Sequence, residues 1–312
     1  MNFRHTIDSI TDLIGGTPII KINRMVKPNW ASVYAKLEWY NIGGSIKDRA
    51  ALSLIETAEV SGKLHKGKTI IEATSGNTGI ALAMIGAAKG YRVSIVMSEG
   101  ASLERRKIIT AYGADLILTP ASRGTAGAIE VKEKMIREHP DRYVSLDQFH
   151  DPANPYSHYM TTGKEIIRQM SGKIDAAVMT VGTGGTSTGV AMRLKEYKPS
   201  IKIIGVTPKL GVKIDGIRNP SEPNPSSNVR LDLLDDLVEI DEITRALCFE
   251  TGRRAAREEG LLIGMSSACA LHVSLSLAEQ LGEGKNIVTI FPDSGYKYLS
   301  TELFEDGGHL LQ

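Results

Sequence analysis

Cysteine is scarce in this sequence, and its scarcity excludes two kinds of architecture. The chain has two cysteines in 312 residues, Cys248 and Cys269. Two cysteines cannot build a disulfide framework or a zinc site. Both stand in apolar segments with a helical pattern, so we predict that they are buried thiols.

The sequence also lacks an excess of charge and a long apolar run. Basic and acidic residues number 37 and 36, without a long block of either sign. This balance argues against nucleic acid or a membrane surface as the main partner. No stretch has the apolar length needed to cross a bilayer, and the N-terminal segment lacks the apolar core of a secretion signal. We therefore expect a protein of the reducing cytoplasm.

From residue 69 onward, short apolar runs alternate with helical patterns. The expected strands are residues 69–73, 91–97, 114–120, 143–146, 175–181, 201–206 and 286–291. The expected helices include residues 80–90, 103–113, 126–138, 157–170, 241–259 and 267–281. This alternation predicts an α/β fold with mostly parallel sheets flanked by helices. Residues 207–232 hold four prolines and are too long for a plain connection, so we expect a functional or mobile loop.

Two glycine-rich turns follow expected strands and open helical patterns. They are TSGNTG at 74–79 and GTGGTSTG at 182–189. In open α/β sheets ligands bind beyond the carboxyl ends of the strands. Glycines, hydroxyls and a helix N-terminus together suit an anion. For either turn alone, a tight turn needed only for packing is an equally good interpretation.

Residues 62–69, GKLHKGKT, formally match the phosphate-loop pattern of nucleotide-binding proteins. That pattern binds phosphate where it follows a strand and opens a helix. Here it follows a helical segment and opens an expected strand. We therefore interpret it as a chance match and assign no phosphate-binding role to Lys68.

Several segments occur in an order and spacing that a known family shares. They are NIGGSIKDRAA (41–51), TSGNTG (74–79), GTGGT (182–186), GMSSA (264–268) and PDSGYKYLST (292–301). With DQF and NPYSHYMTTG, they resemble the cysteine synthase family of fold-type II pyridoxal-phosphate enzymes, and its B type most closely. The resemblance implies two α/β domains of the tryptophan synthase β-like kind. A small, mobile domain over 38–145 would bind the substrate carboxylate, and 1–37 with 146–312 would form the large cofactor-binding domain.

The resemblance also implies a reaction. It is a β-replacement dependent on pyridoxal 5′-phosphate, which makes L-cysteine from O-acetylserine or O-phosphoserine through an aminoacrylate intermediate. The sulfur source would be sulfide, with thiosulfate as a second candidate. Lys47 would hold the cofactor as a Schiff base, and its released amine would move the substrate's Cα proton. The alternative for Lys47 is a helix-entry lysine paired with Asp48.

The remaining site residues are carried over by position from the same resemblance. The cofactor-binding set, besides Lys47, is Asn77, Gly182, Thr183, Gly184, Gly185, Thr186 and Ser266. The set for the substrate carboxylate is Thr74, Ser75, Gly76, Thr78 and Gln148. Asn77 would face the cofactor's ring hydroxyl, residues 182–186 its phosphate, and Ser266 its pyridine nitrogen. No metal is implied. For Thr74 and Ser75, capping of the local turn is an alternative that can coexist with binding.

Three positions need separate comment. Arg218 matches a position where enzymes that use O-phosphoserine carry arginine, and a guanidinium suits a phosphate leaving group. Its alternative is a loop arginine bonded to nearby carbonyls or to a carboxylate such as Asp215. Ala268 stands where the family usually has glycine, and its methyl group would hinder a close approach of another backbone segment there. Thr207 replaces a more usual glutamate, a change that the sequence does not explain.

Two other functions stay open at this stage. One is a different β-eliminating or β-replacing enzyme with the same cofactor, such as a cystathionine β-synthase or a serine dehydratase. The other is a non-catalytic binding or sensor protein that retains the fold. The family further implies a homodimer, whereas the residues do not tell whether a serine acetyltransferase associates with it.

Overall fold

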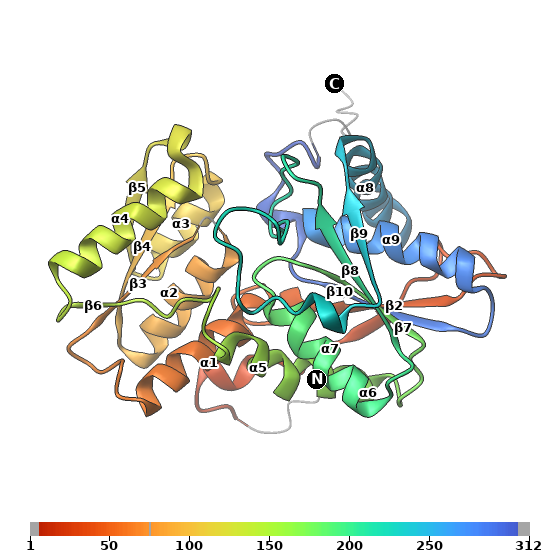
Figure 1. Cartoon of the computed structure of the whole chain (residues 1–312), viewed down its shortest axis with the longest axis horizontal. Helices are drawn as coiled ribbons and strands as arrows, with labels where there is room; N and C mark the ends of the chain where they lie inside the picture. The colour runs from red at the N-terminus through yellow and green to blue at the C-terminus, as the bar shows by residue number, and fades with distance from the viewer. Residues whose placement is uncertain (1–5, 75, 305–312) are drawn as a thin grey trace. The chain divides into compact units, whose positions relative to one another are not determined.

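The computed structural model describes residues 6–74 and 76–304 (Figure 1). The chain forms two compact units. The six-stranded unit comprises Gly15–Tyr40 and the described residues of Pro155–Gln312. The four-stranded unit comprises the described residues of Asn2–Ile14 and Asn41–Asn154. The bounds of the two domains that the resemblance implies, and the mobility of the smaller one, remain predictions.

The sheet of the six-stranded unit is mixed only at one edge. Its order is β1-β2-β10-β7-β8-β9, in which β1 runs antiparallel to β2 and the other neighbours are parallel. The bounds are β1 Ile19–Lys21, β2 Ser32–Leu37, β7 Ala176–Thr180, β8 Lys202–Pro208, β9 Asp236–Ile240 and β10 Asn286–Phe291. Strands β7, β8 and β10 are buried almost throughout, as parallel strands covered on both faces are.

Helices cover both faces of this sheet. They are α5 Ala153–Met160, α6 Thr162–Gln169, α7 Gly185–Tyr197, α8 Glu242–Arg254 and α9 Met265–Leu281. Figure 1 shows α8 and α9 on one side of the sheet and α6 and α7 on the other. The single helix expected over 157–170 is two helices that break at Thr161. After the break Gly163 packs closely on α7, where an added Cβ would lie 2.7 Å from the Cβ of Arg193.

The four-stranded unit has an all-parallel sheet. Its order is β5-β4-β3-β6, with β3 Thr69–Ala73, β4 Arg92–Ser98, β5 Asp115–Thr119 and β6 Tyr143–Val144. The helices are α1 Lys47–Val60, α2 Asn77–Lys89, α3 Leu103–Ala111 and α4 Gly124–Glu138. Helix α2 is buried from Thr78 to Gly86, which explains why it is apolar all round.

Short helical turns connect these elements. They are the 3-10 turns Ile10–Leu13, Glu38–Tyr40, Ala121–Arg123, Leu231–Leu233 and Gly295–Lys297, and a π-helical turn at Ala255–Glu259. The last of these ends the helix that the sequence pattern extended to residue 259. Neither a helix nor a strand lies between Pro208 and Leu231, in agreement with the expected irregular loop.

The fold class predicted from the sequence is confirmed, as are the buried thiols of Cys248 and Cys269. Residues 62–69 leave helix α1 and open strand β3, so the phosphate-loop pattern has the wrong context, as predicted. Strands β1, β2 and β9 were not predicted. Within the described ranges, no helix combines the length and the apolar character that a membrane crossing demands.

Candidate active site

Lys47 is the first residue of helix α1, and the glycines before it have a structural purpose. The Asp48 carboxylate accepts a 2.6 Å hydrogen bond from the N–H of Gly43. A Cβ at Gly43 would lie 2.6 Å from the other Asp48 oxygen, so only glycine fits. The Lys47 N–H donates to the Ser45 hydroxyl at 3.3 Å. The turn therefore fixes the point at which α1 begins and presents Lys47, half-buried, at its first position.

The 74–78 turn joins the end of β3 to the start of α2 in the same unit. Thr74 is buried, its N–H donates to the Val96 carbonyl at 3.1 Å, and its hydroxyl accepts from the N–H of Gly76 at 3.2 Å. Capping of the local turn, the alternative role of Thr74, is thus present. Ser75 lies outside the described residues. Because α2 begins at Asn77, the N-terminus of this helix lies at the turn, and a helix N-terminus suits an anion.

Gln148, far from this turn in the sequence, contacts it. The Thr78 hydroxyl donates to Gln148 Oε1 at 2.7 Å, and each residue is only 4% exposed. The Gln148 carbonyl accepts from Asn154 Nδ2 at 2.7 Å. Since Oε1 is the acceptor for Thr78, the other polar atom of this side chain is the amide nitrogen, which can only donate. The structure therefore brings Gln148 to the predicted carboxylate-binding turn.

The 182–186 turn joins β7 to α7 in the six-stranded unit and is built on close backbone contacts. Gly184 has a φ of +84°, and a Cβ there would lie 2.6 Å from the backbone of Asn228. A Cβ at Gly182 would lie 2.8 Å from the Gly216 carbonyl oxygen. The Ser226 hydroxyl donates to the Thr183 carbonyl at 2.6 Å. The turn is thus a glycine cradle at the start of a 13-residue helix, without an acidic side chain, and it fits a phosphate dianion.

His158 on α5 supports this cradle, although no sequence motif singles it out. The ring is 1% exposed. Its Nδ1 lies 2.9 Å from the Thr162 hydroxyl, and its Nε2 lies 3.4 Å from the hydroxyl of Thr186. A single histidine in a helical pattern carries no signal that could have shown this contact in advance.

Ser266 lies in the first turn of α9 and is 2% exposed. Its hydroxyl has no hydrogen-bond partner among residues 6–74 and 76–304. Gly216, with a φ of +89°, passes close by, since a Cβ there would lie 3.4 Å from the Ser266 hydroxyl. A hydroxyl without a protein partner can donate to a ligand's acceptor atom, which is what a pyridine nitrogen offers.

The PDSGYKY segment holds the start of α9 in place. The Asp293 carbonyl accepts from the N–H of Gly264 at 3.2 Å and from the Ser267 hydroxyl at 3.3 Å. The Asp293 carboxylate accepts from the Tyr298 hydroxyl at 2.8 Å. Ala268, whose methyl group raised a question in the sequence, is fully buried and packs against Gly252 of α8.

Arg218 is engaged within its own loop. Its Nε lies 2.8 Å from Glu222 Oε2 in an ion pair, and its guanidinium also bonds the Pro223 carbonyl. Its N–H donates to the Val181 carbonyl at 2.9 Å, and its carbonyl accepts from the Thr207 hydroxyl at 3.1 Å. Arg218 thus bonds a nearby carbonyl and a carboxylate, that of Glu222, as its alternative describes, and its role in the choice of donor remains a prediction. Thr207, unexplained in the sequence, fixes the Arg218 backbone beside the glycine cradle.

Similarity to known proteins extends over nearly the whole chain. Residues 10–293 match the family model described as pyridoxal-phosphate dependent enzyme. A curated cysteine synthase from Staphylococcus aureus strain Mu50 is 43% identical over 310 residues, which is 96% of this chain and 97% of the relative.

Several solved structures are also similar to this chain over nearly its whole length. The crystal structure of an O-ureido-L-serine synthase is 39% identical with a TM-score of 0.91, covering 98% of this chain and 97% of that one. A hydrogen sulfide-producing enzyme from Fusobacterium nucleatum is 38% identical with a TM-score of 0.88, covering 94% and 100%. Cysteine synthase from Entamoeba histolytica is 37% identical with a TM-score of 0.88, covering 97% and 92%.

Proposed function

This chain belongs to the pyridoxal-phosphate dependent enzymes and has pyridoxal 5′-phosphate as its cofactor, and from that premise we propose that it is a cysteine synthase. In the proposed reaction, sulfur from sulfide replaces the β-oxygen substituent of an activated L-serine, and L-cysteine is formed. The observation that carries the proposal is the 43% identity to a curated cysteine synthase over 96% of the chain.

When bound, pyridoxal phosphate supplies an electron-withdrawing ring that makes the α-proton of an attached amino acid acidic. The cradle at 182–186 would hold its phosphate, through backbone N–H groups and the hydroxyls of Thr183 and Thr186. Ser266 would bond the pyridine nitrogen, and Asn77 would bond the ring hydroxyl. The neutral Ser266 hydroxyl, unlike a carboxylate, would favour an unprotonated ring, which suits replacement at the β-carbon.

Lys47 is the covalent anchor of the cofactor and the residue that moves the proton. Once its amine is released, it takes the proton from the substrate's Cα and later returns it to the same atom. Support for this role comes from the fixed entry of α1, where Gly43 and Asp48 hold the first turn. A side chain anchored at a rigid helix start can reach the same atom twice.

The substrate carboxylate binds at the turn before α2. Backbone N–H groups at 76–78 and the Gln148 amide nitrogen are donors, and the helix N-terminus favours the negative charge. The 2.7 Å hydrogen bond from Thr78 to Gln148 supports this assignment, because it orients the amide with its nitrogen away from Thr78. Ser75, which lies outside the described residues, belongs to the same proposed set.

The choice of donor depends on Arg218. The Arg218 guanidinium is paired with the Glu222 carboxylate, which supports a competition between that carboxylate and the phosphate of O-phosphoserine. O-phosphoserine must therefore displace Glu222, whereas O-acetylserine needs no such exchange. We infer that O-acetylserine is the better donor of this chain and that Glu222→Gln improves kcat/KM for O-phosphoserine. The matched variant Arg218→Ala should lower kcat/KM for O-phosphoserine alone; equal effects on both donors would remove Arg218 from this choice.

Two alternatives are favoured by particular relatives. One relative is titled as a hydrogen sulfide-producing enzyme and another as an O-ureido-L-serine synthase. The same proposed residues could therefore serve elimination from L-cysteine, or addition of a nucleophile other than sulfide. A cystathionine β-synthase, a serine dehydratase and a non-catalytic protein remain the further candidates, while the homodimer and the cytoplasmic setting remain predictions.

A product screen tests the proposed function. The holoenzyme is incubated with O-acetylserine, O-phosphoserine or L-serine, each with sulfide or thiosulfate, and amino acids and pyruvate are quantified. We expect one L-cysteine for each O-acetylserine consumed with sulfide, and little pyruvate. Pyruvate as the main product, or sulfide release from L-cysteine at a higher rate than its synthesis, would contradict the assignment in favour of a lyase.

A further inference from the structure

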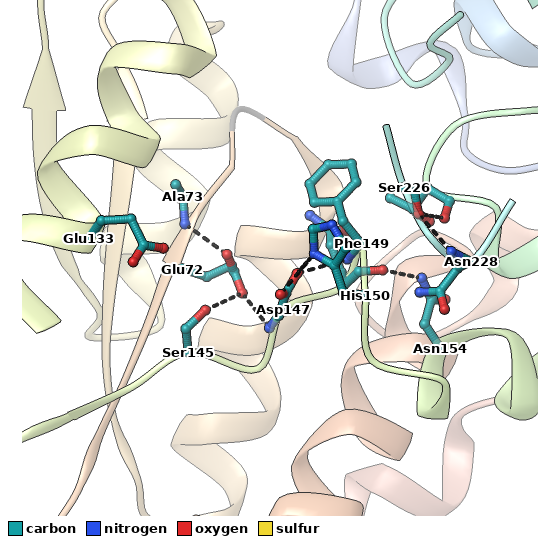
Figure 2. A network of polar contacts seen from close by, with 12 residues as sticks. Glu72, Ala73, Glu133, Ser145, Asp147, Phe149, His150, Asn154, Ser226 and Asn228 are labelled. Atoms are coloured by element: carbon teal, nitrogen blue, oxygen red, sulfur yellow. Dashed lines mark hydrogen bonds and ion pairs between the residues drawn. The ribbon is translucent and has the colours of Figure 1, made fainter. Parts of the chain in front are cut away.

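A buried carboxylate lies directly behind the predicted carboxylate-binding turn. Glu72 is 3% exposed and occupies the next-to-last position of β3, two residues before Thr74. Its Oε1 accepts from the Ala73 N–H at 3.1 Å. Its Oε2 accepts from the Asp147 N–H at 3.1 Å and from the Ser145 hydroxyl at 3.4 Å. Figure 2 shows this side chain in the middle of a polar network that extends from β3 to residue 150.

Glu72 joins strand β3 to the segment that follows β6, beyond the point where the two strands stop pairing. Strand β6 pairs with β3 through only two residue pairs, Thr69 with Tyr143 and Ile70 with Val144. Strand β6 ends at Val144, so the half-buried N–H of Asp147 has no partner in the sheet ladder. The Glu72 carboxylate supplies the acceptor, so one side chain takes the place of the missing ladder bonds.

The Asp147 backbone has an unfavourable conformation that needs such support. Its φ is +49°, in the left-handed region that residues other than glycine seldom adopt. Its own carboxylate accepts from the Phe149 N–H at 3.3 Å and lies 2.9 Å from His150 Nδ1 (Figure 2). The Asp147 backbone is therefore held from both sides, and the next residue along the chain is Gln148.

We propose that Glu72 is a positioning residue for substrate binding: by holding the Asp147 N–H it fixes Gln148 against Thr78, with the Gln148 amide nitrogen set for the substrate carboxylate. This inference rests on the proposed function, since it deepens the role of Gln148. Glu72 itself does not touch the substrate. It acts through the turn at Asp147, which connects the strand below the site to the side chain that binds.

One positive charge lies beside the buried Glu72 carboxylate and opposes the cost of its burial. Lys132 of α4 places its ammonium 3.7 Å from Glu72 and 3.1 Å from Glu133, and it donates to the Ser145 hydroxyl at 3.3 Å. The other charged or titratable groups of the network are the Asp147 carboxylate and the His150 ring. Burial raises the pKa of the Glu72 carboxyl, while Lys132 works against that shift. Every group hydrogen-bonded to Glu72 is a donor, so the single oxygen of a glutamine amide can take the place of Oε1 or Oε2 but not of both, and its nitrogen then faces a donor.

The test compares Glu72→Gln with Glu133→Gln, a matched control that removes the other carboxylate of Lys132 without touching Asp147. KM for O-acetylserine and the dissociation constant for L-alanine, which has no leaving group, are measured; L-alanine binding is followed by the absorbance of the bound cofactor. For Glu72→Gln we expect both to rise roughly 10-fold or more, with kcat within about 3-fold and cofactor affinity unchanged. The control should stay within about 2-fold on every quantity.

A double-mutant cycle separates positioning from a merely structural role. In a Gln148→Ala background, Glu72→Gln should weaken L-alanine binding by less than about 2-fold, because the residue it positions is gone. The same loss in both backgrounds, or a lowered melting temperature with unchanged L-alanine binding, would overturn the inference. If Glu72→Gln does not fold, Lys132→Gln is tested in its place. Without the Lys132 ammonium the Glu72 carboxylate takes up a proton more readily, so the L-alanine affinity of Lys132→Gln should fall below that of the wild type as the pH is lowered. An unchanged pH dependence would also count against the proposal.

The inference and the proposed function fail in different ways. A wild-type protein that binds L-alanine but forms no L-cysteine contradicts the proposed function, and the binding cycle still tests Glu72. A wild-type protein that forms L-cysteine, together with a Glu72→Gln variant that binds L-alanine as tightly, overturns only the inference.

Discussion

The two glycine-rich turns, 182–189 and 74–79, look alike in sequence and differ in how they are held. In the first, added Cβ atoms at Gly182, Gly184 and Gly189 would lie 2.8, 2.6 and 2.1 Å from backbone atoms of other segments. In the second, no described atom beyond its chain neighbours lies within 4 Å of a Cβ built at Gly76. The first turn is defined by backbone packing, whereas the second has open space at Gly76. A Cβ at its other glycine, Gly79, would meet only side chains, those of Ile109 and Thr74 at 3.1 Å.

Side chains support the 74–79 turn instead. The hydroxyl of Thr74 caps it, and Gln148 bonds Thr78 from a segment that Glu72 holds. A phosphate that stays bound needs a rigid cradle, whereas an amino acid that enters and leaves at each turnover is suited by a site of adjustable side chains. The difference predicts that substitution of Gly182, Gly184 or Gly189 damages the first turn, whereas the second tolerates substitution of Gly76 and is damaged by polar side-chain substitutions.

The largest effect is expected from Gly184→Ala. A methyl group there meets the Asn228 backbone at 2.6 Å, and the φ of +84° is itself unfavourable for alanine. We expect a loss of about 2–4 kcal/mol in the free energy of unfolding and weak retention of the cofactor. The matched Gly76→Ala variant should stay within about 0.5 kcal/mol and keep the cofactor. Urea unfolding and absorbance after gel filtration measure both; equal losses would abolish the contrast between the turns.

A second prediction concerns the packing of helix α8 against the start of α9. A Cβ at Gly252 would lie 2.9 Å from the Cβ of Ala268. Gly252→Ala should therefore destabilise the protein by about 2 kcal/mol, although alanine favours helices. Ala268→Gly in the same chain should recover most of that loss, which thermal unfolding can measure. Additive losses in the double variant would show that the two positions do not crowd each other.

A smaller and more selective effect is expected in the other turn. Thr78→Val removes the hydroxyl that donates to Gln148 and leaves a buried acceptor without that bond. KM for O-acetylserine should rise roughly 10-fold, with the cofactor retained. Thr110→Val in α3, which removes an exposed hydroxyl of the same unit, is the control. Cofactor loss in Thr78→Val would mean that the two turns are not separable in function.

The smallest effect is a pH dependence of stability. Burial raises the pKa of the Glu72 carboxyl above its ordinary value of 4.5, even with Lys132 beside it. The folded state then binds this proton more tightly than the unfolded chain, so the stabilisation is complete below pH 4.5 and is lost as the pH rises through the raised pKa. The stability of the wild type relative to Glu72→Gln should fall over that range. Urea unfolding at several pH values measures it, and a constant difference would contradict the shift.

Most of the fold was predictable because its signals are local. Buried β-branched runs such as 69–73 and 286–291 and the glycine that ends α2 each specify an element within a few residues. Strands β2 and β9 were missed because Ser32–Leu37 and Asp236–Ile240 mix charged and apolar residues and lack a clear period. The break at Thr161 was missed because nothing local ends the helix there, and packing on α7 decides it.

The site was predictable only where its motif is contiguous. Lys47 and the two turns stand in recognisable order, but their roles came from resemblance. The contacts that support them join residues distant in the sequence: Glu72 with Asp147, His158 with Thr186, and Thr207 with Arg218. Glutamate, histidine and threonine at such positions have many structural uses, so only the folded chain identifies these pairs.

The central claim is that Lys47 carries the cofactor, and chemical trapping tests it directly. The holoenzyme is reduced with borohydride and digested, and the peptide that bears the cofactor's mass is identified by mass spectrometry. We predict that the modified peptide contains Lys47 and that the modification is absent from Lys47→Ala but present in Lys68→Ala, the lysine of the chance phosphate-loop match. Modification of any other lysine in the wild type, or its persistence in Lys47→Ala, would contradict the account.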